Sequence, residues 1–183
     1  MTSTIEFRSP GASFDEPIEM WLGCHQRVRR FAALLGRLKT HVESCGADAE
    51  AQMGAASIRR YFNEAAPRHH EDEEVDLFPL LRERGTDTAT LAVLERIEAE
   101  HLAMAALWRE LDAVLARISV GERAALDATL VSRFAAAYDA HIEAEETVVL
   151  PALKRALLPA DWTAVGRAMA ERRGLDWTIE PRV

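Results

Sequence analysis

The sequence predicts an all-α protein, an up-down-up-down antiparallel four-helix bundle followed by a short C-terminal fifth helix. Three observations support this fold class. Apolar residues recur at helical spacing along four long stretches, breaks of a few residues with a glycine separate these stretches, and alanine is abundant while β-branched runs are absent. Long helices joined by short loops pack as antiparallel neighbours, and this packing produces a bundle.

The expected helices, in chain order, cover about residues 16–44, 48–84, 87–119 and 121–157, with a short one at 160–178. Gly46 and Gly85 follow the first two helices, as glycine commonly does at a helix end. Pro67 lies inside the second helix and should kink it or split it in two. Asp161 could cap the fifth helix and Gly174 could end it.

The chain is expected to contain one core domain. Residues 1–15 are polar, without periodicity, and are typical of a flexible N-terminal tail. No linker divides residues 16–158, which form the predicted bundle. Residues 159–183 form a C-terminal extension that is expected to pack on the bundle, and its Trp162 and Trp177 could cover the bundle or contact a partner.

Composition excludes several classes of partner. The net charge of −8 argues against nucleic acid, because affinity there depends on a cationic surface. We expect no membrane partner, since no run approaches the ~18 apolar residues of a membrane span. The N-terminus has no apolar signal segment, and Cys24 and Cys45, if both lie on the first helix, are too far apart for a disulfide. These features predict a cytoplasmic protein with reduced thiols.

One pattern, His-x3-Glu-Glu-x4-(Phe or Leu)-Pro, occurs twice and carries the functional argument. The two copies consist of His69, Glu73, Glu74, Phe78 and Pro79, and of His141, Glu145, Glu146, Leu150 and Pro151. A histidine and a glutamate four residues apart lie about 40° apart around a helix, so both can reach one metal ion. Two copies suggest two similar helices that face each other across a shared site.

The apolar seam of every predicted bundle helix contains one histidine: His25, His69, His101 and His141. The seam of the second helix continues to Leu77 and Leu80, and that of the fourth to Val148 and Ala152. Neighbouring seam histidines lie at nearly equal sequence distances from the breaks between their helices. Because antiparallel helices rise at equal rates, the four imidazoles should meet at one level.

The chemistry of this convergence favours metal binding. Buried ionised carboxylates such as Glu73 and Glu145 are costly unless they are paired or bind a metal. A mixed set of imidazole and carboxylate ligands suits iron, manganese or zinc. Six ligands exceed the need of one tetrahedral zinc, so two ions bridged by the two glutamates fit the count better.

The chain resembles the hemerythrin-like HHE cation-binding family over about residues 16–157. The resemblance rests on His25 in the first helix, HHEDEEVDLFPLL at 69–81, EAEH at 98–101 and HIEAEETVVLP at 141–151. It implies that a non-haem di-iron centre, with an oxo or hydroxo bridge, is held by His25, His69, Glu73, His101, His141 and Glu145. Two iron ions are the expected cofactor, and manganese or zinc remain open.

Several residues remain alternatives or departures. His70 competes with His69, but its own helical face is polar, so we place it in solvent or behind the ligands. Glu146 competes with Glu145 as the last carboxylate. Oxygen-carrying hemerythrins have a further histidine where this chain has Ile97, so an iron could keep an open position, or Glu98 could swing in. His41 lies about 160° from His25 around the helix and is left out.

The resemblance implies a di-iron protein that binds or reacts with oxygen, nitric oxide or peroxide, or that serves iron homeostasis. The ligand would bind in an apolar pocket formed by Ile97, Met104 and Trp108. A metal-dependent sensor or interaction module without turnover is the alternative, and a metal-free structural bundle is a third reading. Whether the protein is an enzyme and whether it forms a homodimer stay open.

Overall fold

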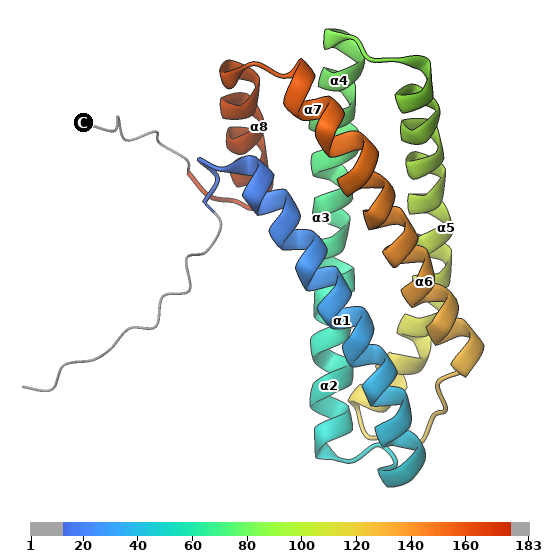
Figure 1. The fold of residues 1–183 in the computed structure, drawn as a ribbon. Coiled ribbons are helices and arrows are strands. Elements are labelled where there is room, and N and C mark those ends of the chain that lie inside the picture. The colour runs from blue at the N-terminus through green and yellow to red at the C-terminus, as the bar shows by residue number, and fades with distance from the viewer. Residues whose placement is uncertain (1–12, 177–183) are drawn as a thin grey trace, which may run out of the picture.

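The computed structural model describes residues 13–176, which form four long antiparallel helical columns and a shorter helix beside one end (Figure 1). The columns are, in order, α1 (Pro17–Cys45); α2 (Ala49–Arg60), α3 (Ala66–Glu71) and α4 (Phe78–Arg84); α5 (Thr88–Ser119); and α6 (Ala128–Ala144) and α7 (Leu150–Ala156). The shorter helix is α8 (Pro159–Arg172). Within the described range no strand occurs, and the predicted fold class is confirmed.

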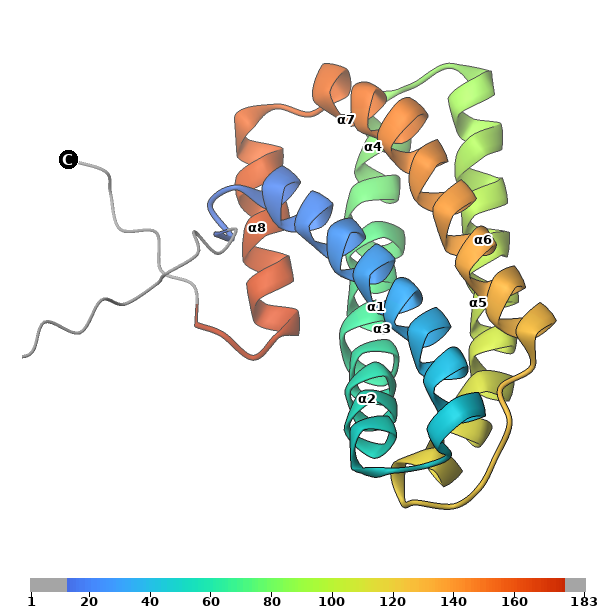
Figure 2. The ribbon, with the colours of Figure 1, turned by 60° about the horizontal axis from the view of Figure 1, so that its bottom comes forward.

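Each column packs beside the next, because α1 contacts α2 and α6, and α5 contacts the same two helices. Figure 2 shows α8 lying beside the first turns of α1, away from the α1–α2 connection. Most of the predicted N-terminal tail and Trp177 lie outside the described residues. No helix in residues 13–176 combines the length and the apolar character needed to cross a membrane.

Aspartates begin three of the helices. Asp48 accepts a hydrogen bond from the Ala51 amide (2.9 Å) at the start of α2. Asp87 and Asp127 make the same contact at the starts of α5 and α6, at 2.8 and 2.7 Å. Each cap satisfies an amide that the helix leaves free, and is worth about 1 kcal/mol.

The expected start of the fourth helix is wrong. Residues 120–127 form a loop, and the column begins at Ala128 instead of Gly121. Gly121 adopts φ of 82° directly after α5, and Asp127 supplies the cap. The alanine-rich loop sequence looks helical, but Leu126 is buried and fixes the loop against the core.

The fifth helix ends at Arg172, two residues before Gly174, whose φ of 71° agrees with the expectation that this glycine ends the helix, although the expected range ran on to residue 178. Asp161 does not cap it from outside. Its carboxylate lies in the first turn, accepts a hydrogen bond from the Leu158 amide (2.8 Å) and forms an ion pair with Arg84. Asp161 therefore also joins α8 to the end of α4.

Three short π-helical segments interrupt the columns: η1 (Tyr61–Ala65), η2 (Asp72–Leu77) and η3 (Glu145–Val149). In each, an amide bonds the carbonyl five residues before it, from Ala66 to Tyr61, from Phe78 to Glu73 and from Leu150 to Glu145. A proline directly follows each donor residue. Proline has no N–H and its ring collides with the carbonyl four residues earlier, and the wider turn relieves both problems.

The second column is therefore helical through Pro67; of the two outcomes expected there, a kink or a split, the split is wrong. Each π segment adds a residue to a turn and shifts the phase of the helix that follows. Leu81 is buried in place of the expected Leu80, and Val149 in place of Val148.

The apolar core consists of two clusters. The far-end cluster, near the α1–α2 connection, includes Val28, Ile58, Phe62, Trp108 and Phe134. The α8-end cluster includes Trp21, Phe78, Ile97, Val149 and Met169. A layer of buried polar side chains lies between the two clusters along every column.

Candidate metal centre

The predicted ligands make up that polar layer. Along α1, His25 lies between Trp21 of the α8-end cluster and Val28 of the far-end cluster. Along α5, His101 lies between Ile97 and Met104 in the same way. The six side chains are all buried: His25, His69, Glu73, His101, His141 and Glu145. The structure therefore brings together every residue that the sequence predicts for the site.

These side chains form two overlapping groups of four. The first contains His25 and His69, and the second contains His101 and His141; Glu73 and Glu145 belong to both. Within each group the nearest ligand atoms all lie within 4.8 Å of one another. Two cations could therefore sit side by side with two carboxylates between them.

Each glutamate presents one oxygen to each group. Glu145 Oε2 lies 3.3 Å from His25 Nε2, and Oε1 lies 3.3 Å from His141 Nε2. Glu73 Oε1 lies 3.1 Å from His69 Nε2, and Oε2 lies 3.3 Å from His101 Nε2. A carboxylate that bridges two metal ions needs this disposition.

The hydrogen bonding of the layer is incomplete without a further group. His25 Nε2, Glu73 Oε2 and both Glu145 oxygens are buried and have no hydrogen-bond partner among the described residues. Such atoms are rare in native proteins, because each one loses its hydration without compensation. A cation between them would receive their lone pairs, so the donor set fits a metal pair.

A second layer of carboxylates fixes three of the imidazoles. Nδ1 of His25 contacts Glu146 (3.0 Å), Nδ1 of His101 contacts Glu74 (2.6 Å), and Nδ1 of His141 contacts Glu100 (3.0 Å). An Nδ1–H that donates outward leaves the Nε2 lone pair directed at the centre. The second glutamate of each Glu-Glu pair is therefore engaged, and the sequence argument, which gave Glu74 no function, missed this role. The repetition of the pair at equal spacing was the available signal.

Trp21 is another contributor that the sequence argument missed. Its indole Nε1 donates a hydrogen bond of 2.5 Å to Glu73 Oε1, and its ring lies edge-on to His25, with centroids 4.6 Å apart. The contact orients the Glu73 carboxylate, while Oε2 has no hydrogen-bond partner and faces His101.

The two glutamates differ in charge state without a metal. Burial and the nearby Glu145 raise the pKa of Glu73 to about 7. Burial acts in the same sense on Glu145, but the adjacent His141 and His25 hold its pKa well below the usual value. Burial opposes a proton on His141, yet Glu145 outweighs it and raises the pKa of His141 to about 9. A cation would replace the protons that these groups carry.

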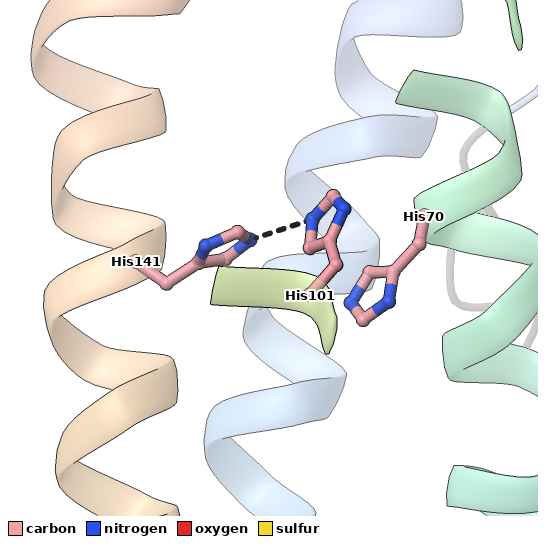
Figure 3. A group of neighbouring side chains, drawn as sticks. All are labelled: His70, His101 and His141. Carbon is pink, nitrogen blue, oxygen red and sulfur yellow. Dashed lines mark hydrogen bonds between the residues drawn. The ribbon is translucent and has the colours of Figure 1, made fainter. Parts of the chain in front are cut away.

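His70 does not lie in solvent. Its ring stacks on that of His101, with centroids 3.9 Å apart and planes 11° apart, and its Nε2 is buried without a hydrogen-bond partner. Figure 3 shows His70 reaching from its helix towards His101, while His141 approaches from the opposite side. One ligand atom each of His70, His101 and His141 lie within 4.8 Å of one another, so they form a third donor group.

The remaining candidates lie outside these groups. Glu98 forms a two-pronged ion pair with Arg82 on α4, with both contacts at 2.9 Å. His41 pairs with Asp48 near the α1–α2 connection. Ile97 is fully buried in the α8-end cluster.

This fold and this layer define a class of protein, the helical bundle that holds cations between His-x3-Glu pairs. Residues 16–153 match the hemerythrin HHE cation-binding domain, and the chain belongs to this family. It is also 36% identical over 163 residues to an uncharacterized protein of Haemophilus influenzae, a match that covers 88% of this chain and 92% of the relative.

Proposed function

We propose that the protein is a cytoplasmic non-haem di-iron protein that binds or reacts with oxygen, nitric oxide or peroxide, or serves iron homeostasis. The observation that supports it best is the sharing of Glu73 and Glu145 between two buried groups of four ligands. One ion would be held by His25 and His69, the other by His101 and His141, and both by the two glutamates. Imidazole and carboxylate ligands suit iron, with manganese or zinc as the competing ions.

A bound di-iron pair would supply redox and Lewis-acid chemistry for a small ligand. The protein supplies orientation and exclusion of water. Glu74, Glu100 and Glu146 direct the imidazoles, and such outer partners also increase the basicity of a ligand. Ile97 and Met104, each fully buried one turn from His101, would present apolar walls to a diatomic ligand or peroxide.

Metal content tests the proposal. We expect two iron ions per chain after expression in iron-supplemented medium, with an absorption band that appears when the anaerobic protein is exposed to air. The double variant E73Q/E145Q should lose both ions, while H41Q, which changes a histidine paired with Asp48, should keep them. Wild-type protein that takes up no iron, under conditions where it is folded, would rule out the di-iron function.

Rapid mixing separates the ligands. The reduced iron-loaded protein would be mixed with oxygen, nitric oxide and peroxide in turn, and the spectral change followed in time. A reaction that completes with one of them at low concentration identifies the physiological class. Spectra that none of the three alters would leave iron homeostasis as the function.

A metal-dependent interaction module is the second candidate, and one contact favours it. Asp72, the residue before Glu73, is buried and forms ion pairs with Arg172 and Arg173 at the end of α8. Metal binding at Glu73 could therefore change how rigid α8 is, and a partner protein would recognise that change. Hydrogen exchange of α8 tests this: equal protection with and without metal would count against the module.

A further inference from the structure

We propose that His70 is a third imidazole ligand to the ion held by His101 and His141, so that the two metal positions differ in their donor sets. The inference rests on the proposed di-iron function and adds a ligand to it. The ion between His25 and His69 would have two imidazoles and two shared carboxylates, and the other would have three imidazoles and the same carboxylates.

The first support is an unpaired donor. His70 Nε2 is buried and has no hydrogen-bond partner within residues 13–176. A buried ring nitrogen without a partner loses its hydration, and a bound cation would repay that loss.

The second support is position. His70 belongs to a group with His101 and His141 whose ligand atoms lie within 4.8 Å of one another. Nitrogen ligands lie about 2.1 Å from an ion, so two of them stand at most about 4.2 Å apart. A modest rotation of the stacked His70 ring therefore brings its lone pair to the ion that the other two imidazoles share (Figure 3).

The third support is the set of side chains around His101. The helical turn before His101 carries Ile97, which is fully buried and offers no ligand atom. His70 approaches His101 from α3, and Glu74, one turn further on, contacts His101 Nδ1 at 2.6 Å. At His70 and Glu74 the polar face of the second column therefore contacts His101.

His70 lies beside proposed ligands, so its position alone could explain an effect on metal binding. The variants H70A and H70F separate the two roles. H70F keeps an aromatic ring to stack on His101 and lacks the nitrogen donor, whereas H70A lacks both. H41A serves as the matched histidine control, since His41 pairs with Asp48 at the other end of the bundle.

The readouts are the dissociation constants of the two ions in an anaerobic Fe(II) titration and the Mössbauer spectrum of the ⁵⁷Fe-loaded protein. Wild-type protein should give two quadrupole doublets of equal area. H70A and H70F should both bind the second ion at least about tenfold more weakly and should change one doublet, leaving the other and the first dissociation constant as in wild type. A direct ligand should cost no less than the 10- to 100-fold loss seen for an outer partner.

H70F that matches wild type in both readouts would overturn the proposal and assign His70 a stacking role. H70A that matches wild type would overturn it as well. Thermal melts of the metal-free variants check the fold, and if H70F fails to fold, the H70A doublet decides. Wild-type protein that binds no more than one ion would overturn both this inference and the di-iron function, whereas two ions that H70A and H70F leave unchanged would overturn this inference alone.

Discussion

At the scale of single residues, the candidate centre depends on which atom of each side chain faces inward. Glu73 and Glu145 occupy equivalent places in the two sequence repeats, yet Trp21 donates a hydrogen bond to Glu73 alone, while Glu145 lies beside His25 and His141. In the metal-free protein burial and the nearby Glu145 raise the pKa of Glu73 to about 7, while His141 and His25 hold that of Glu145 well below its usual value. The two carboxylates therefore start metal binding from different protonation states.

Metal affinity should consequently rise with pH. Binding requires ionised Glu73 and neutral His141, and in the metal-free protein their pKa values are about 7 and about 9. Both groups hold protons below these values, so the affinity should fall as the pH is lowered from 9 to 6, roughly tenfold per pH unit for each proton displaced. Titrations with Zn(II) at several pH values measure it, and proton release can be followed with an indicator dye. An affinity that is constant between pH 6 and 9 would contradict the charge states.

Glu74 should affect metal binding although its own side chain is partly exposed to solvent. The variant E74Q weakens the contact that directs His101 Nε2 inward, and we expect a 10- to 100-fold loss of metal affinity. E98Q is the matched control, since Glu98 is also a glutamate on the surface and pairs with Arg82 away from the ligands. Equal affinities for E74Q and E98Q would show that the Glu74 contact has no orienting effect.

The six residues could be predicted from the sequence because helical spacing alone brings them to one level. The contacts that support them could not be predicted in this way. Glu100 reaches His141 from α5, and Trp21 reaches Glu73 from α1, and these pairs are distant in sequence and depend on how the columns rotate against each other. The sequence placed His70 in solvent or behind the ligands; the solvent alternative is wrong, because the His70 ring stacks on that of His101 on α5.

At the scale of elements, the π segments distinguish this bundle from four regular helices. η2 and η3 begin at or next to the ligands Glu73 and Glu145, and each precedes a proline in the interior of a column. Sequence periodicity predicted the helices and their order. A constant period of 3.6 residues per turn does not include the extra residue that each π segment adds to its turn. The buried Leu81 and Val149 therefore fell one position away from the expected seam.

A double-mutant cycle tests whether η2 exists to accommodate Pro79. Deleting Val75, an exposed residue inside η2, would restore a regular helix and keep Leu77 and Phe78 in their packing positions. Pro79 would then collide with the preceding turn, and we expect the deletion to lower the free energy of unfolding by about 3 kcal/mol. P79A should recover most of that loss in the deleted chain and change little in the full chain. Urea denaturation measures all four proteins, and additive effects would show that proline and π segment are independent.

At the scale of the whole molecule, the buried polar layer lowers the stability of the metal-free protein, and metal binding can offset that loss. It separates two apolar clusters and leaves buried atoms without hydrogen bonds in the absence of a cation. The class of fold could be predicted from periodicity, glycine-containing breaks and composition. The start of the fourth column could not, because the Asp127 cap lies within a stretch whose sequence looks helical.

Metal should therefore stabilise the entire bundle. At a free concentration 100 times the dissociation constant, a ligand bound only by the folded state contributes about 2.7 kcal/mol. For a chain of this size we expect Tm to rise by roughly 5–10 °C. Scanning calorimetry with metal and then with excess EDTA measures the shift, and E73Q/E145Q should show none. A Tm that EDTA leaves unchanged in metal-loaded wild-type protein would support a purely structural bundle.

The division of the core into a far-end and an α8-end cluster has a consequence for the evolution of the sequence. The two clusters are separate and the six side chains lie between them, so we expect that the far end can diverge or be exchanged for that of a relative while the centre survives. A chimera that takes its far-end residues from the Haemophilus influenzae relative should then retain the metal content of the parent chain.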